Sequence, residues 1–478
     1  MKVTFATGPL SLIELAALCR GELVGCQNPQ ATITAICTDS SEADAQTAFL
    51  TLPGKHSDGE AHLAQAVGQN CPCVICSRLP SLPACAVLTR DREAVPFLLA
   101  RAVLQRVHPR CVAVTGSAGK TTTKEFIAAV LSQKYPTFKT AGNHNSTVGM
   151  PLSLLEMAPG SEWAVLEMGM NAPGEIEKLA RLAKPEIAAV TNVGTAHIGL
   201  LGSRQAILQA KLEILSGLHQ NGVFLLNLDD DLLKDSIGKN YRKISLSANG
   251  RKADFSAKNI RVEPQKTIFD LDWYGGHEAN VCLPVPGKHF VSAALFAYAA
   301  GISAGVAPDA VRAALSNTTP GTFRQQCSVV GGVLLIEDCY NASPESMTAA
   351  LETLFTICKQ EKRRGIAVLG DMLELGAASK EQHRKIGNLF ARGNAEFLFA
   401  VGKDGAEIAA GALSAGTPSK NVFQNPDPAD LTATLTGLKA ILKAGDVVLI
   451  KASRKIAAER IGSALKEFLE EKEGRDHA

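Results

Sequence analysis

Short apolar runs alternate with amphipathic segments along most of this chain. The runs "CVAVTG" at 111–116, "WAVLE" at 163–167 and "VVLIK" at 447–451 are apolar and rich in β-branched residues, which is typical of strands buried on both faces. The segments between such runs have helical periodicity. In "TTTKEFIAAVLSQ" at 121–133, for example, the apolar residues recur on one helical face. Alternating strands and helices predict parallel sheets with helices on both faces.

Two departures from this alternation divide the chain. A period-two pattern from 253–262 to 278–287 indicates an antiparallel excursion, and "NTTPG" at 317–321 is typical of a linker. The length of 478 residues suffices for about three domains. We therefore predict an α/β protein with a small N-terminal α/β domain at 1–86, a central α/β domain with the antiparallel excursion at 87–319, and a C-terminal Rossmann-like α/β domain at 320–478.

The charge and hydropathy of the chain argue against two kinds of partner, nucleic acids and membranes. The chain has 49 basic and 47 acidic side chains and a net charge of +2, which argues against a nucleic-acid-binding surface. No apolar run approaches the roughly 20 residues that span a bilayer, and the N-terminus lacks a signal-peptide pattern. We expect a cytoplasmic, monomeric protein without membrane insertion.

The twelve cysteines are scattered along the chain. The cluster Cys71, Cys73 and Cys76 has no partner pair at metal-ligand spacing. We therefore expect buried reduced thiols.

The segment "TGSAGKTTTK" at 115–124 follows a predicted strand and precedes a predicted helix, which is the context of a phosphate-binding loop. It departs from the usual G-x-x-x-x-G-K-[ST] pattern, because Val114 stands at the first glycine position. Lys120 can reach the β- and γ-phosphates of a nucleotide, and Thr121 can offer its hydroxyl to Mg²⁺. The predicted nucleotide contacts of this loop are Gly116, Ser117, Ala118, Gly119, Lys120, Thr121 and Thr122.

The form T-G-[ST]-x-G-K-T-[ST] resembles the phosphate loop of the Mur ligase superfamily, the ATP-dependent amide ligases of peptidoglycan assembly. Other segments resemble the superfamily in the same order: "TAGNHNSTVGMP" at 140–151, "LEMGMNAPGEI" at 166–176, "TNVGTAHIGLLGS" at 191–203 and "AKLEIL" at 210–215. The last third of the chain is similar to the member that uses D-alanyl-D-alanine, in "EDCYNASPESM" at 337–347, "LGDMLELG" at 369–376 and "IKASRK" at 450–455. The resemblance covers nearly the whole chain.

This resemblance implies a reaction. The γ-phosphate of ATP would be transferred to the carboxylate of UDP-N-acetylmuramoyl-tripeptide, and the amine of D-alanyl-D-alanine would attack the resulting acyl phosphate. ATP and two Mg²⁺ ions are the implied cofactors, and the implied process is peptidoglycan precursor synthesis for cell wall biogenesis. The sequence leaves open whether the third residue of the tripeptide is lysine or diaminopimelate.

The resemblance also assigns catalytic and metal-binding roles. The implied catalytic residues are Lys120, Lys211, His197 and Arg324. The implied magnesium ligands are Thr121, Glu167, His197 and Lys211. A lysine ammonium would be repelled by metal ions, so the resemblance implies that Lys211 is carbamylated and carries a negative charge. From the residues alone, His197 could instead be a loop histidine, and Lys211 a surface lysine on a helix.

Further positions match nucleotide and substrate contacts of the superfamily. Asp338, Tyr340 and Asn341 resemble its contacts to adenosine, with a plain strand-end turn as the alternative. The implied substrate contacts are Ser40, Lys55, Asp58, Gly59, Asn143, Asn145, Lys451, Ser453 and Arg454.

One segment departs from the superfamily near the base of the nucleotide. "GKHFVSA" at 287–293 places Phe290 and Ala293 where related ligases carry two asparagines. Phe290 either stacks on the adenine or turns into the core, and a neutral hydrogen bond lost at the base would weaken the selection of ATP over GTP only modestly.

Two rival functions remain at this stage. A phosphate-loop GTPase would share the loop, but the chain contains no N-K-x-D guanine motif. Another amino-acid-adding or polyglutamate-adding ligase of the same superfamily would share most of the motifs.

Overall fold

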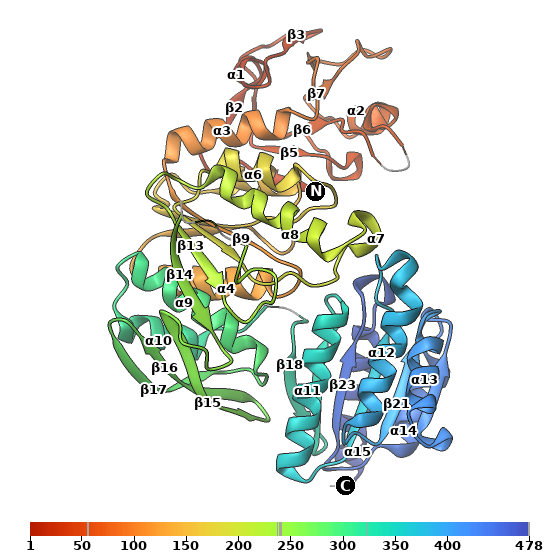
Figure 1. Ribbon diagram of the computed structural model, residues 1–478. Helices are drawn as coiled ribbons and strands as arrows, with labels where there is room; N and C mark the ends of the chain where they lie inside the picture. Colours follow the sequence, from red (N-terminus) through yellow and green to blue (C-terminus); the bar gives the residue numbers. More distant parts are fainter. Residues whose placement is uncertain (55–56, 237, 239–240, 322, 477–478) are drawn as a thin grey trace.

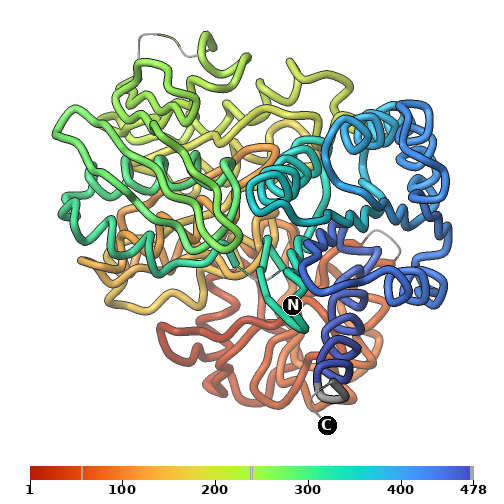
Figure 2. Tube along the Cα trace, turned by 90° about the horizontal axis from the view of Figure 1, so that it is seen from below, coloured from red at the N-terminus to blue at the C-terminus, as the bar shows by residue number. Residues whose placement is uncertain are grey.

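The computed structural model describes residues 1–54, 57–236, 238, 241–321 and 323–476. Three large sheets follow one another along the chain, and Figure 1 shows them from the N-terminal part at the top to the C-terminal part at the lower right. Figure 2, turned by 90°, shows the blue C-terminal part beside the green central part. Among the described residues, no helix has the length and apolar character needed to cross a membrane.

The first sheet has the order β1-β5-β6-β7-β8-β3, with β5 to β8 parallel and both edge strands antiparallel. Its strands are β1 Lys2–Thr4, β3 Glu22–Val24, β5 Ala35–Cys37, β6 Thr47–Leu50, β7 Cys73–Cys76 and β8 Ala86–Leu88. A separate pair is formed by β2 Leu10–Ser11 and β4 Thr32–Ile33, and the helices are α1 Leu12–Leu18 and α2 Leu63–Gly68. The sheet continues to Leu88, two residues past the predicted boundary at 86, and the division into domains stays a prediction.

The second sheet has the order β10-β11-β9-β12-β13-β14-β15-β16-β17. It is parallel from β10 to β15, and β15, β16 and β17 form the antiparallel part that the period-two pattern predicts. Its strands are β9 Arg110–Thr115, β10 Thr137–Lys139, β11 Trp163–Glu167, β12 Ile187–Val190, β13 Val223–Asn227, β14 Arg242–Ser247, β15 Phe255–Glu263, β16 Lys266–Trp273 and β17 Gly276–Leu283.

Helices cover both faces of this central sheet, because its strands are apolar on both sides. They are α3 Val95–Val107, α4 Lys120–Leu131, α5 Gly149–Ser153, α6 Glu175–Ala183, α7 Ile198–Leu201, α8 Arg204–Leu212, α9 His289–Ser303 and α10 Pro308–Asn317. One face packs against α4, α9 and α10. The core on the other face is continuous with the core of the first sheet, which joins the first two parts of the chain.

The third sheet has the order β18-β19-β23-β20-β21-β22, and only β18 is antiparallel. Its strands are β18 Gln326–Val330, β19 Val333–Asp338, β20 Gly365–Gly370, β21 Phe397–Val401, β22 Val422–Asn425 and β23 Val447–Lys451. Its helices are α11 Pro344–Glu361, α12 Ser379–Arg392, α13 Gly405–Ser414, α14 Thr432–Ile441 and α15 Glu459–Asp476. The first three pack on one face and the last two on the other. The apolar runs "VLLIED" at 333–338, "GIAVLGD" at 365–371, "FLFAVG" at 397–402 and "VVLIK" at 447–451 predict β19, β20, β21 and β23, and the outer strands β18 and β22 add to them.

Candidate nucleotide and substrate site

A cleft of about 930 Å³ lies between the central sheet and the third sheet. The phosphate loop and the carboxyl ends of β11 and β12 line one side, and the ends of β19 and β23 line the other. Parallel sheets bind ligands at the carboxyl ends of their strands. Two such edges therefore face each other across one cavity.

The phosphate loop begins where β9 ends at Thr115. Gly116 has φ +150°, and a Cβ there would lie 1.8 Å from Oγ1 of Thr191. Gly119 has φ +79° and leads into α4. The turn therefore starts at Gly116, and the earlier glycine of the usual pattern is replaced by Val114, which is fully buried in β9.

Two side chains that the sequence did not single out hold this loop. Asn192 Oδ1 accepts a hydrogen bond from Ala118 N at 2.9 Å, and Thr191 Oγ1 donates to Ala118 O at 2.6 Å. Both residues follow β12 directly. Their role depends on the pairing of β12 with β9, which a local motif does not reveal.

Lys120 curls over the phosphate loop. Its Nζ donates to Gly116 O at 2.7 Å, so the ammonium lies against the backbone of the loop. Burial lowers the pKa of Lys120, and the negative charge of Glu167 opposes that shift. The arrangement places a cation at the site that the sequence predicts for phosphate.

Glu167 is the centre of a polar chain between the domains. Its Oε2 accepts from Thr121 Oγ1 at 2.7 Å, and its Oε1 accepts from Asn145 Nδ2 at 2.6 Å. Arg324, which follows the linker, donates from Nη2 to Thr121 Oγ1 at 2.9 Å. Hydroxyl and carboxylate oxygens side by side are ligands that suit Mg²⁺. Four residues that the resemblance selects are therefore in direct contact.

Lys124 fixes the loop that carries Asn143 and Asn145. It is fully buried, and its Nζ donates to Thr140 O at 2.6 Å and to Gly142 O at 3.1 Å. The sequence analysis did not assign it a role. The only signal was a lysine on the apolar helix after the phosphate loop.

His197 and Lys211 lie on the segments that follow β12. His197 has φ +66°, lines the cleft, and places Nδ1 3.1 Å from Oε2 of Glu374 in the third domain. Lys211 lies on α8 and is 1% exposed, so the alternative of a surface lysine is wrong. Burial lowers the pKa of Lys211 well below its ordinary value, and the positive charge of Lys120 adds to this effect.

The side chains of Thr121, Glu167 and His197 would need one more oxygen ligand nearby to form a magnesium site. Among the described residues, no group of three or more His, Cys, Asp and Glu side chains is arranged to hold a metal ion. Glu167 and Thr121 supply oxygen atoms, and His197 supplies a nitrogen. A neutral amine on Lys211 is a poor ligand for a hard cation, whereas a carbamate on the same nitrogen would offer oxygen.

The adenosine candidates lie on the third-domain side. The guanidinium of Arg324 lies over the ring of Tyr340, 4.2 Å from its centroid. Lys451 Nζ donates to Asp338 Oδ2 at 2.6 Å and to Asn341 O at 3.0 Å. Lys451, predicted as a substrate contact, thus holds the segment predicted to contact adenosine.

Ser453 and Arg454 differ in exposure. Ser453 is 1% exposed, and its Oγ accepts from Leu373 N at 3.1 Å, so in this structure it supports the loop after β20. Arg454 is more than half exposed and donates to Glu459 Oε1 at 2.6 Å. Both line the cleft.

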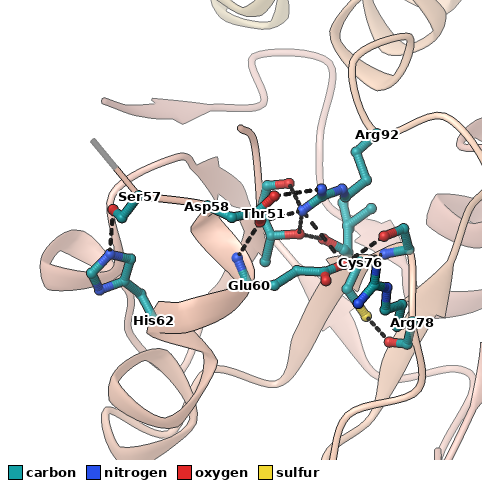
Figure 3. A network of polar contacts seen from close by, with 10 residues as sticks. Thr51, Ser57, Asp58, Glu60, His62, Cys76, Arg78 and Arg92 are labelled. Carbon is teal, nitrogen blue, oxygen red and sulfur yellow. Dashed lines mark hydrogen bonds and ion pairs between the residues drawn. The ribbon is translucent and has the colours of Figure 1, made fainter. Parts of the chain in front are cut away.

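The first-domain candidates mostly hold loops together. Both oxygens of Asp58 pair with Arg92, at 2.7 and 2.9 Å, and Arg92 also donates to Thr51 O at 3.0 Å (Figure 3). Gly59 allows a close approach, since a Cβ there would lie 2.8 Å from Leu52 N. Ser40 donates to Gln65 Oε1 at 2.7 Å.

Lys55 lies outside the described residues. Arg92, which the sequence analysis missed, fixes the segment that follows Lys55 through Asp58.

Phe290 packs into the core and also borders the cleft. It is 4% exposed and packs among the buried residues of α9, with its ring 4.1 Å from that of His289. Ala293, one turn later, is 6% exposed. Of the two alternatives for Phe290, this geometry supports packing into the core.

Known proteins place these observations in a family. The Mur ligase middle domain matches residues 114–301, and the Mur ligase, glutamate ligase domain matches residues 323–454. The UDP-N-acetylmuramoyl-tripeptide–D-alanyl-D-alanine ligase of Bacillus subtilis is 36% identical over 451 residues, which are 94% of this chain and 96% of the relative.

Solved structures agree with this match. The structure of MurF from Acinetobacter baumannii has a TM-score of 0.86 and 30% identity, covering 96% of this chain and 99% of that one. MurF ligase from Thermotoga maritima, solved in complex with ADP, has a TM-score of 0.81 and 28% identity, covering 91% and 98%.

Fold and site together define an α/β enzyme with three large sheets and a cleft between the second and the third. The chain belongs to the Mur ligase family.

Proposed function

We propose that the chain is an ATP-dependent ligase that adds D-alanyl-D-alanine to UDP-N-acetylmuramoyl-tripeptide in peptidoglycan precursor synthesis. One observation carries this proposal: Arg324 of the third domain hydrogen-bonds Thr121 of the phosphate loop, which in turn bonds Glu167. Groups from two domains thus converge beside the phosphate loop. The name of the Bacillus subtilis relative supplies the substrates, and the ADP complex of the Thermotoga maritima relative supports the nucleotide.

The chemistry proceeds in two balanced steps. A carboxylate oxygen of the tripeptide attacks the γ-phosphorus of ATP, and ADP leaves. The amine nitrogen of D-alanyl-D-alanine then attacks the carbonyl carbon of the acyl phosphate, loses a proton, and expels inorganic phosphate. Lys120 and Arg324 neutralise the charge that develops on the transferred phosphoryl group, and the closing domains hold the reactants in line.

Lys211 is proposed to act as a carbamate. Its neutral nitrogen would attack CO₂ and release one proton, which leaves an anionic carbamate. With Thr121, Glu167 and His197, it would hold Mg²⁺, which stabilises negative charge on phosphate oxygens when bound. We further propose that the enzyme works as a monomer in the cytoplasm.

Phosphate release tests the proposed function. We expect release to require ATP, UDP-N-acetylmuramoyl-tripeptide and D-alanyl-D-alanine together, and to stop when any one is omitted. Phosphate release that depends on a free amino acid such as glutamate, and not on D-alanyl-D-alanine, would favour another ligase of the family.

Replacing Arg92 with alanine is expected to weaken binding of the uridine substrate. The Asp58 carboxylate would lose a bidentate, charge-assisted pair, and the segment around Gly59 would lose its anchor. We expect KM for the UDP substrate to rise by about tenfold with little change in kcat. Arg110→Ala, which removes the pair with Glu186 at the amino-terminal end of β9, is the control. Equal KM values in both variants would contradict this role.

Replacing Phe290 with asparagine is expected to destabilise the protein. The change leaves a cavity and buries an amide in the core, at a cost of about 3–5 kcal/mol. The midpoint of thermal unfolding should fall by several degrees, whereas Ser292→Ala, a half-buried neighbour that lines the cleft, should change it little. An unchanged midpoint together with a lower KM for ATP would mean instead that Phe290 faces the base.

A further inference from the structure

Glu345 is a third-domain carboxylate that reaches the loop carrying His197. It is the second residue of α11, and its Oε1 accepts hydrogen bonds from Thr195 N at 2.5 Å and from Thr195 Oγ1 at 2.8 Å. The two residues are 150 positions apart. Hydrogen bonds to a carboxylate are stronger than neutral ones, so this contact is a substantial link between the two domains.

The loop at 194–197 leaves room for the Glu345 carboxylate at Gly194. Gly194 precedes Thr195, and a Cβ at Gly194 would lie 2.4 Å from Cδ and Oε1 of Glu345. Gly194 N also donates to Oγ of Ser117 in the phosphate loop at 2.9 Å. Two consecutive residues therefore connect Glu345 on one side with the phosphate loop on the other.

The second oxygen of Glu345 takes no part in the contact with Thr195. Oε2 is buried and has no hydrogen-bond partner among the residues that the structure describes. The negative charge of Glu345 raises the pKa of Lys211 and so opposes the effect of burial there. A buried carboxylate needs compensation by hydrogen bonds or charge. Docking of the third domain supplies it through the two hydrogen bonds from Thr195.

Glu345 contacts the central domain differently from Arg324 and Glu374. Arg324 and Glu374 contact the side chains of Thr121 and His197, whereas Glu345 also binds a backbone N–H. It therefore fixes the path of the loop and not only one side chain.

We propose that Glu345 is a positioning residue, which couples docking of the third domain to the placement of the 194–197 loop and of the phosphate loop. This inference rests on the proposed function and deepens it. Glu345 acts through Thr195 and Gly194, which orient His197 and Ser117. Without this contact, the third domain still folds but closes on the cleft less often.

Three variants test the coupling. Glu345→Ala removes both hydrogen bonds, and Glu345→Gln keeps an acceptor for Thr195 N but loses the charge. Glu352→Ala, at an exposed position on the same helix, is the matched control. For each variant we would measure kcat, KM for ATP, KM for the UDP substrate and the midpoint of thermal unfolding. We would also measure the radius of gyration with a non-hydrolysable ATP analogue.

We expect kcat of Glu345→Ala to fall by at least about tenfold, which corresponds to the loss of one charge-assisted hydrogen bond. KM for the UDP substrate should stay unchanged, because the first-domain contacts are intact. The radius of gyration with the analogue should exceed that of the wild type. For Glu345→Gln, kcat and the radius of gyration should lie between those of Glu345→Ala and the wild type. Glu352→Ala should match the wild type in both.

Wild-type kcat and wild-type compaction in Glu345→Ala would overturn the proposal. If Glu345→Ala does not fold, Thr195→Ala replaces it: losing the hydroxyl that donates a charge-assisted hydrogen bond to the Glu345 carboxylate should lower kcat by about tenfold, and an unchanged kcat would overturn the proposal equally. Compaction is measured without the peptide substrates. If the wild-type protein makes no product from the named substrates, the proposed function fails while the test of Glu345 still stands.

Discussion

Lys120→Ala is expected to abolish turnover while leaving the fold intact. Lys120 is half-buried above the phosphate loop, and its Nζ hydrogen-bonds two backbone carbonyls of that loop, Gly116 O and Ser117 O. Its loss should therefore cost little stability. During phosphoryl transfer the same ammonium would face the charge on the transferred group, and removing one such preorganised donor lowers kcat by about 10²–10³-fold.

Lys178→Ala is the matched control, because Lys178 lies exposed on α6 of the same domain. It should retain wild-type kcat. Circular dichroism and the thermal midpoint check that both variants are folded. If Lys120→Ala keeps more than about a tenth of the wild-type kcat, the segment at 115–124 is not the phosphate site of this reaction.

Lys211→Ala is expected to be nearly inactive and to recover in part when short carboxylic acids are added. Lys211 is 1% exposed, and burial holds its pKa well below the ordinary value. The lowered pKa of Lys211 favours the unprotonated nitrogen, which is the form that attacks CO₂. Truncation to alanine opens space beside the cation site, and formate or acetate would restore the missing anionic oxygens there.

Two controls separate the carbamate from other roles of Lys211. Lys211→Arg introduces a guanidinium, which keeps a positive charge and cannot form a carbamate. This variant should be inactive. Lys120→Ala should show no recovery with the same acids, since it lacks a cation and not an anion. Normal activity of Lys211→Ala in the absence of added acids would rule out the carbamate.

The sequence predicts the parts of this molecule that depend on local pattern. The strand ends of β9, β11, β19 and β23 follow from apolar runs, and the phosphate loop follows from its position between a strand and a helix. The order of strands places those ends at one cleft.

The supporting contacts could not be predicted in the same way. Arg92 and Asp58 are 34 positions apart, Lys124 and Thr140 are 16 apart, and Glu345 and Thr195 are 150 apart. Each pair joins segments that carry no shared pattern, and only the folded chain brings them together. The burial of Lys211 was missed for a related reason: α8 is covered on the face that carries Ile207, Leu208, Ala210 and Lys211, and a single helix does not reveal what packs on it.

The most direct test of the central claim is the mass of the product. The purified protein is incubated with ATP, Mg²⁺, UDP-N-acetylmuramoyl-tripeptide and an equimolar mixture of D-alanyl-D-alanine, L-lysine, diaminopimelate and glutamate. We predict one nucleotide product, whose mass equals that of the UDP substrate plus D-alanyl-D-alanine minus one water, formed with one ADP and one phosphate per bond. A product that carries any of the other amines instead, or ATP hydrolysis without amide formation, would contradict the account.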